Sequence, residues 1–80
     1  MERANILAEV QDIFRDILDE EELILEDNTT AGDVDGWDSL THIQLVVAVE
    51  KHFKFKFTSK EILSWNNVGE MIDSIKSKID

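Results

Sequence analysis

The sequence predicts an all-α fold, a small four-helix bundle with a long loop between helices one and two and a short third helix. Three observations predict it: apolar residues recur at helical spacing, two capping-box patterns mark further helix starts, and there is no proline. A chain of 80 residues has room for one hydrophobic core, so we expect residues 1–80 to form a single domain. With 42% apolar residues, it is too hydrophobic for a disordered acidic tail.

The first helix is predicted at residues 3–18. At 100° per residue, the apolar side chains from Ile6 to Leu18 fall within an arc of about 140°. Residues 19–38 are rich in turn formers, which predicts a long loop without regular structure. Loops of this length in compact domains are uncommon and often functional. Four apolar residues are expected to hold the loop to the core: Leu23, Ile24, Leu25 and Val34.

The second helix is predicted from Asp38 and Ser39, both good N-cap residues, to about Phe53. Its apolar side chains fall into two arcs on different faces. One arc is expected to face the core and contains Leu45, Val46, Val49 and Phe53. The other is free for a partner and contains Leu40, Ile43 and Val47.

The alternating segment Lys54–Phe57 could be a strand by its period alone. Since no second strand is available to pair with it, we predict a loop whose phenylalanines pack inward. Thr58 with Glu61 forms a capping-box pattern for a short third helix through about Trp65. Asn67 with Glu70 forms a second one, which begins the last helix. The apolar face of that helix contains Val68, Met71, Ile72, Ile75 and Ile79.

Composition excludes several classes of function. The net charge of −10 would repel nucleic acid and anionic membranes, so we expect neither nucleic-acid binding nor membrane insertion. The absence of cysteine removes disulfides, thiolate zinc sites and a cysteine nucleophile. No apolar stretch reaches about 18 residues and no signal peptide is visible, so we expect a cytoplasmic protein. So small a chain rarely supplies a catalytic cleft, and an independent enzyme is not expected.

The charge is uneven along the chain. Residues 1–38 hold 13 acidic and 2 basic residues, a net charge of −11. Residues 39–80 hold 5 acidic and 6 basic residues, a net charge of +1. The span Asp27–Asp38 has the length of an EF-hand loop, but Thr29 and Ala31 stand where oxygen-rich ligands are needed, so no metal site is predicted.

Ser39 is the residue at which chemistry is expected. A serine hydroxyl is a poor nucleophile without an oriented base, and His42 on the same helix does not make a catalytic pair without a cleft. A helix N-terminus does stabilise an anion through its free N–H groups and its dipole, so Ser39 is better placed to carry a phosphodiester. The local alternative is that Ser39 or Asp38 is simply an N-cap.

The segment Gly36-Trp37-Asp38-Ser39-Leu40, followed by Ile43, Leu45, Val46, Glu50 and Phe53, resembles the phosphopantetheine attachment region of acyl carrier proteins. The order of the predicted elements resembles that family along nearly the whole chain. The resemblance implies that Ser39 receives 4′-phosphopantetheine from coenzyme A through a phosphopantetheinyl transferase and Mg²⁺. The cofactor thiol would carry an acyl group between enzymes of a fatty-acid, polyketide or specialised lipid pathway.

The resemblance also implies which residues meet the acyl-loading and acyl-processing enzymes. Leu40, Ile43 and Val47 would supply apolar contacts, and Asp38 and Glu50 acidic ones. Fatty-acid carriers usually have a strongly acidic second helix. Here those positions and the segment after them read Thr41, Gln44, Lys51, His52, Lys54, Lys56 and Lys60. Partners that recognise a dense acidic stripe should therefore bind this protein less well, and we expect a carrier of a specialised pathway; the alternative is drift on an ordinary fatty-acid carrier. We expect the carrier to be a monomer.

Two alternatives remain open at this point. One is an aminoacyl or D-alanyl carrier. The other is a noncovalent helical adaptor that binds its partner through the Leu40-Ile43-Val47 face. Ser39 distinguishes them, because a carrier needs its hydroxyl and an adaptor does not.

The aromatic residues and histidines have mainly structural interpretations. Trp37 either anchors the loop on the second helix or shields the arm, and Trp65 is expected in the core. His42 is expected to be partly buried and hydrogen-bonded, and His52 to be solvated.

Overall fold

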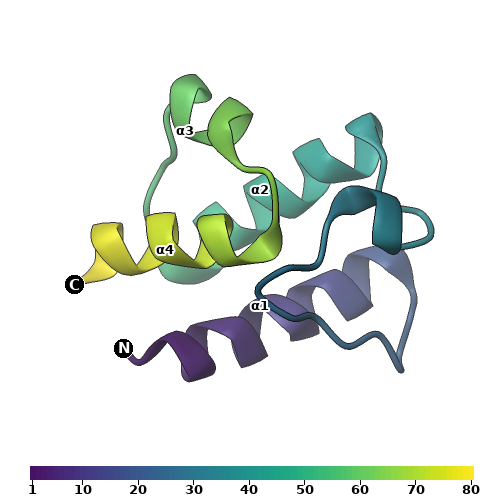
Figure 1. Ribbon diagram of the computed structural model, residues 1–80. Helices are drawn as coiled ribbons and strands as arrows, with labels where there is room; N and C mark the ends of the chain where they lie inside the picture. Colours follow the sequence, from purple (N-terminus) through teal and green to yellow (C-terminus); the bar gives the residue numbers. More distant parts are fainter.

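The computed structural model describes residues 1–80 and contains four α-helices and no strand. Figure 1 shows α1 (Arg3–Leu18), α2 (Ser39–Phe53), α3 (Ser59–Ser64) and α4 (Val68–Ile79). The predicted fold class and order of the helices are confirmed. The long α1–α2 loop contains a short 3₁₀ helix, η1 (Ala31–Asp33), which was not predicted. It forms because the Asp33 carboxylate accepts the Thr30 N–H at 3.0 Å.

The core lies where α1 packs against α2 and α4 (Figure 1). Ile6, Val10 and Phe14 of α1 are fully buried, and the predicted inward face of α2 is buried at Leu45, Val46 and Val49. The α4 face is buried at Val68, Met71, Ile72 and Ile75. The short helix α3 contributes no fully buried residue, but its Ile62 packs against the core and its Glu61 forms an ion pair with Lys78 of α4 at 3.0 Å. The segment Lys54–Phe57 is a loop whose Phe57 is buried and Phe55 half-buried, as predicted.

The loop contacts the core through three of the four predicted residues. Leu25 and Val34 are buried and Leu23 is half-buried. The prediction for Ile24 is wrong, because its side chain is 70% exposed. Ile24 faces solvent between Leu23 and Leu25, which face the core, the alternation that an extended backbone produces.

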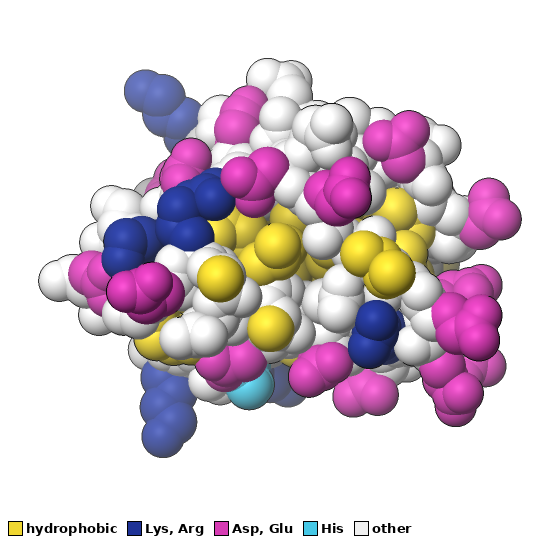
Figure 2. All heavy atoms as spheres, turned by 60° about the horizontal axis from the view of Figure 1, so that its bottom comes forward, with side chains coloured by type: hydrophobic (Ala, Val, Ile, Leu, Met, Phe, Trp, Pro, Cys, Tyr) yellow, Lys and Arg dark blue, Asp and Glu magenta, His cyan; other side chains and the backbone are white.

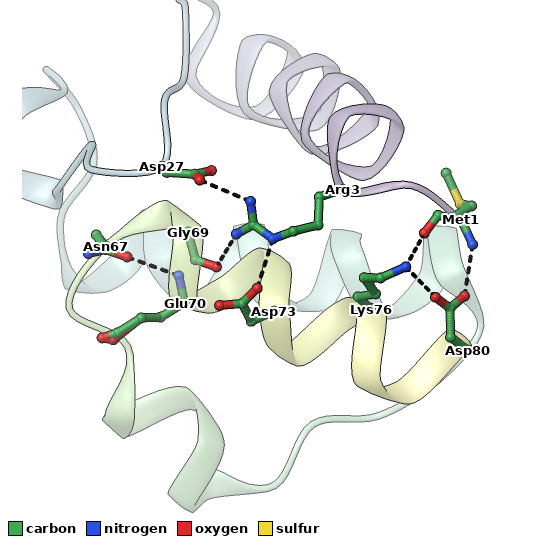
Figure 3. A network of polar contacts seen from close by, with 9 residues as sticks. All are labelled: Met1, Arg3, Asp27, Asn67, Gly69, Glu70, Asp73, Lys76 and Asp80. Atoms are coloured by element: carbon green, nitrogen blue, oxygen red, sulfur yellow. Dashed lines mark hydrogen bonds and ion pairs between the residues drawn. The ribbon is translucent and has the colours of Figure 1, made fainter.

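Polar contacts join the chain ends and the loop to α4 (Figure 3). The Arg3 guanidinium donates to Asp27 at 2.9 Å, to Asp73 at 2.8 Å and to the Gly69 carbonyl at 3.1 Å. The Gly69 N–H donates to the Asp27 carbonyl at 2.8 Å, and the Val68 N–H donates to a second loop carbonyl. The loop therefore satisfies two N–H groups that the start of a helix leaves free.

Candidate functional site

Ser39 is the first residue of α2, at the end of the long loop. Gly36 has φ +83°, a conformation that a residue without a Cβ adopts readily. The Thr41 hydroxyl donates to the Gly36 carbonyl at 2.6 Å and accepts the Asp38 N–H at 2.8 Å. The Asp38 carboxylate accepts the N–H groups of Leu40 and Thr41, each at 3.0 Å. These bonds hold the loop-to-helix junction in one conformation.

Asp38, and not Ser39, is the N-cap of α2. The exposed Ser39 hydroxyl makes no hydrogen bond within the chain, so it is free for modification. Asp38 accepts two of the first three N–H groups of α2, so the Ser39 N–H is the one of these three that is left free for an anion. The Thr41 N–H bond also keeps the pKa of the Asp38 carboxyl below its ordinary 3.8, so a negative charge lies beside the serine.

A surface groove of about 570 Å³ begins beside Ser39 and extends between α2 and α3. Its lining comes from the loop and from three helices and includes Trp37, Ser39, His42, Ile43, Ile62, Leu63, Trp65 and Met71. Both indole N–H groups are satisfied, Trp37 by His42 Nδ1 at 3.0 Å and Trp65 by Ser74 Oγ at 2.8 Å. The groove lining is mainly apolar, and its polar residues are Asp38, Ser39, His42, Asn66 and Asn67.

His42 is half-buried and hydrogen-bonded, as predicted. Burial lowers its pKa below the ordinary 6.5, so the imidazole is neutral at pH 7. Its Nδ1 accepts from Trp37, and no hydrogen bond joins it to Ser39. Trp37 packs edge-on against Phe14 with ring centroids 4.9 Å apart, which supports its interpretation as a loop anchor. Trp65 was predicted to lie in the core. It lies at the edge of the core instead, half-buried against Phe57.

The outward face of α2 is apolar and open to solvent. Leu40, Ile43 and Val47 are 68%, 63% and 42% exposed. Asp38 is exposed near one end of this face, whereas Glu50 is half-buried and its carboxylate accepts the Phe57 N–H at 2.7 Å. Contact of these five residues with a partner remains a prediction.

Two features were missed by the sequence reasoning. Leu63 of α3 is 84% exposed and lines the groove. The signal was the adjacency of Ile62 and Leu63, since neighbours 100° apart on so short a helix do not both face the core. His52 is exposed, as expected, but the contact of its Nε2 with the Glu9 carboxylate at 2.6 Å, which joins α2 to α1, was not predicted.

The described chain holds no group of three or more His, Asp or Glu side chains placed to bind a metal ion. None of its helices has the length and apolar character needed to cross a membrane.

A small helical bundle with an exposed serine at the start of α2 is the arrangement expected of a carrier domain, and comparison with known proteins shows the family. The sequence model of the family described as "Phosphopantetheine attachment site" matches residues 8–75. The chain therefore belongs to this family, the acyl carrier proteins, whose prosthetic group is covalently bound phosphopantetheine. Such proteins carry acyl groups for enzymes and are not enzymes themselves.

Two relatives illustrate the likeness. An acyl carrier protein of Coprothermobacter proteolyticus is 31% identical over 80 residues, covering 99% of this chain and 96% of the relative. The solution structure of the holo acyl carrier protein from Geobacter metallireducens superimposes with a TM-score of 0.87 at 38% identity. That match covers 92% of this chain and 85% of the other.

Proposed function

We propose that this protein is a discrete acyl carrier in which Ser39 bears the 4′-phosphopantetheine arm. The observation that carries the proposal is the exposed, unbonded Ser39 hydroxyl at the first position of α2, within the span that the family matches. The serine oxygen would form the phosphodiester with coenzyme A as the donor, losing its proton as adenosine 3′,5′-bisphosphate leaves. When bound, the arm supplies a thiol that holds an acyl group as a thioester.

The residues beside Ser39 suit such a group. Trp37, Ile43 and Leu63 line the groove next to the serine and would contact the arm. The Ser39 N–H is the remaining donor for the phosphodiester, while the Asp38 carboxylate would repel it. The phosphate would be held covalently by Ser39 but would make few noncovalent contacts with the helix start. The arm would therefore be free to move between the groove and a partner enzyme.

The transferase and the acyl-processing enzymes would approach along the outward face of α2. Leu40, Ile43 and Val47 would give apolar contacts and Asp38 and Glu50 acidic ones. Four lysines, from the last turn of α2 to the first turn of α3, set this part of the protein apart from a dense acidic stripe. This favours a polyketide or specialised lipid pathway over primary fatty-acid synthesis. The cytoplasm is the expected location, since acyl carrier proteins typically work there.

The test is the intact mass of the purified protein before and after incubation with coenzyme A, Mg²⁺ and a broad-specificity phosphopantetheinyl transferase. We expect one phosphopantetheinyl group on the wild type and none on Ser39→Ala. Ser59→Ala is the matched control, because Ser59 is also exposed and is also the first residue of a helix. It should gain the group as the wild type does.

A gain on Ser39→Ala would place the attachment elsewhere. No gain on folded, unmodified wild type with several transferases would favour the noncovalent adaptor instead.

If the wild type gains the group, the modified protein is offered malonyl, long-chain acyl and aminoacyl donors with their loading enzymes. Loading by amino acids alone would identify an aminoacyl carrier.

A further inference from the structure

The basic residues of this chain divide into two groups. Of the eight lysines and arginines, four are paired with carboxylates: Arg3, Arg15, Lys76 and Lys78. The other four are exposed and make no ion pair or hydrogen bond: Lys51, Lys54, Lys56 and Lys60. These four follow one another along the chain, from the last turn of α2 to the first turn of α3. The free positive charge of the molecule is therefore gathered in one segment.

Three of these lysines border one surface depression of about 390 Å³. Its lining is Val47, Glu50, Lys51, Lys54, Phe55 and Lys56, which we call the lysine surface. Glu50 is its single acid, and the Glu50 carboxylate accepts the Phe57 N–H and pairs with none of the lysines. The apolar rim residue Val47 is 42% exposed.

Local stability accounts for only part of this arrangement. Lys51 and Lys54, at the C-terminal end of α2, interact favourably with the helix dipole. Lys56 lies in a loop and gains nothing from a helix, and Lys60 lies in the first turn of α3, where the dipole disfavours a cation. Lys54 also occupies a left-handed conformation, φ 63°, where glycine costs less.

We propose that the lysine surface docks against an acidic patch on an enzyme that acts on the carried group. Charge complementarity carries this inference, with Val47 as an apolar contact that continues onto the outward face of α2. Along α2, at 1.5 Å per residue, the lysine surface extends from about 12 Å from Ser39 at Val47 to about 22 Å at Lys54. An enzyme bound there leaves Ser39 uncovered, so docking and access to the arm are compatible.

A protein patch suits this surface better than a membrane or a nucleic acid. Without the four lysines the net charge of −10 becomes −14. An extended anionic surface, such as a membrane or a nucleic acid, would face the acidic residues of the molecule as well as the four lysines. The acidic residues, which are more numerous, would repel it. A partner protein can present acids to the lysines alone. The proposal rests on the proposed function only in taking the partner to be an enzyme of the carried group.

The experiment follows the ¹⁵N spectrum of the apo and the phosphopantetheinylated protein during titration with a synthetic glutamate-rich peptide that contains leucines. We expect shift changes confined to residues 47–60, which fade when salt rises from about 0.15 M to about 1 M. The triple variant Lys51→Gln/Lys54→Gln/Lys56→Gln should bind about tenfold more weakly, as expected for three exposed ion pairs of modest strength.

The matched control has the same net charge as the triple lysine variant but keeps the lysine surface. Asn5→Asp, Ala8→Glu and Ser77→Glu place three new acids at exposed positions of α1 and α4 without breaking an ion pair. This control should bind the peptide nearly as well as the wild type. An equal loss in the control would show that only total charge matters and would overturn the proposal.

Other occupants would also overturn it. Phosphatidylglycerol vesicles or duplex DNA that shift residues 47–60 more strongly than the peptide would indicate a lipid or nucleic-acid surface. Shifts that depend on protein concentration alone would indicate a second copy of the chain. The mass gain at Ser39 in the lysine variant is measured separately, so a failure of docking is distinguishable from a failure of the carrier function.

Discussion

The imidazole of His42 is held in one tautomer by its neighbour. The Trp37 indole N–H is only a donor, so His42 Nδ1 must be the acceptor of their 3.0 Å bond and the ring proton must lie on Nε2. Protonating Nδ1 would place two N–H groups face to face and break the bond. Burial of His42 acts in the same direction, since it lowers the pKa of the imidazole. The loop anchor beside Ser39 therefore depends on a neutral His42.

This dependence predicts a pH effect on stability. The pKa of His42 is about 6.5 in the unfolded chain and lower in the folded one, so between these values the unfolded state binds more protons. The His42 contribution to the free energy of unfolding is fully present above about 6.5 and is lost as pH falls toward the folded pKa. Urea unfolding of the wild type and His42→Gln at several pH values measures it.

We expect the wild type to lose stability between about pH 7 and pH 5 more steeply than His42→Gln. The two proteins differ only at position 42, so the difference between their pH profiles reports on His42. Carboxyls with lowered pKa values, such as Asp38 and Glu61, act only below their ordinary values of 3.8 and 4.5. Parallel pH profiles for the two proteins would contradict the role given to His42.

At the scale of the elements, the start of α4 is fitted closely to the long loop. Val68 and Gly69 donate their N–H groups to the carbonyls of Thr29 and Asp27, at 2.9 and 2.8 Å. A Cβ added at Gly69 would lie 2.9 Å from the Asp27 carbonyl oxygen, which is too close for an unchanged backbone. The glycine thus permits the approach of two backbone segments, with Arg3 bonded to both (Figure 3).

Gly69→Ala should therefore lower the free energy of unfolding by about 1–3 kcal/mol, the usual cost of overpacking. Gly32→Ala is the control, because the nearest atom to its new Cβ is the Thr30 hydroxyl at 3.8 Å and its φ is not in the left-handed region. That variant should be neutral, or more stable by about 0.4–1 kcal/mol through reduced freedom of the unfolded chain. Urea denaturation compares the two, and equal effects would refute the close fit at Gly69.

An element could be predicted from the sequence where the residues that form it are close together along the chain. The Thr58 and Asn67 caps act within three residues, so the starts of α3 and α4 were readable from the sequence. The Ser39 motif is similarly local. The groove beside it joins the loop to α4, and the His52–Glu9 contact joins residues 43 apart, so neither has a local signal. Ile24 failed because its orientation depends on the backbone course of an irregular segment.

At the scale of the whole molecule, charge is separated along the chain and over the surface. The first 38 residues carry a net charge of −11. Figure 2 shows acidic side chains crowded toward one end of the displayed face and most of the basic ones toward the other. Arg3 and Arg15 are the only basic residues of the acidic half, and Arg3 bonds to two acids at once. Most of the remaining acids face solvent and one another without a cation between them.

Two effects of salt therefore compete in this protein. Screening weakens the surface ion pairs, each of which contributes little, and it also weakens the repulsion among the unpaired acids. With 18 acidic and 8 basic residues, repulsion outweighs attraction, so added NaCl should raise the melting temperature. A gain of about 1 kcal/mol corresponds to about 4–8 °C in a domain of this size.

The variant Glu20→Gln/Glu21→Gln/Glu22→Gln removes three exposed charges. Its melting temperature should be higher than that of the wild type at low salt and should change less with NaCl. A melting temperature that does not change with salt in either protein would mean that ion pairs and repulsion balance, against the charge count.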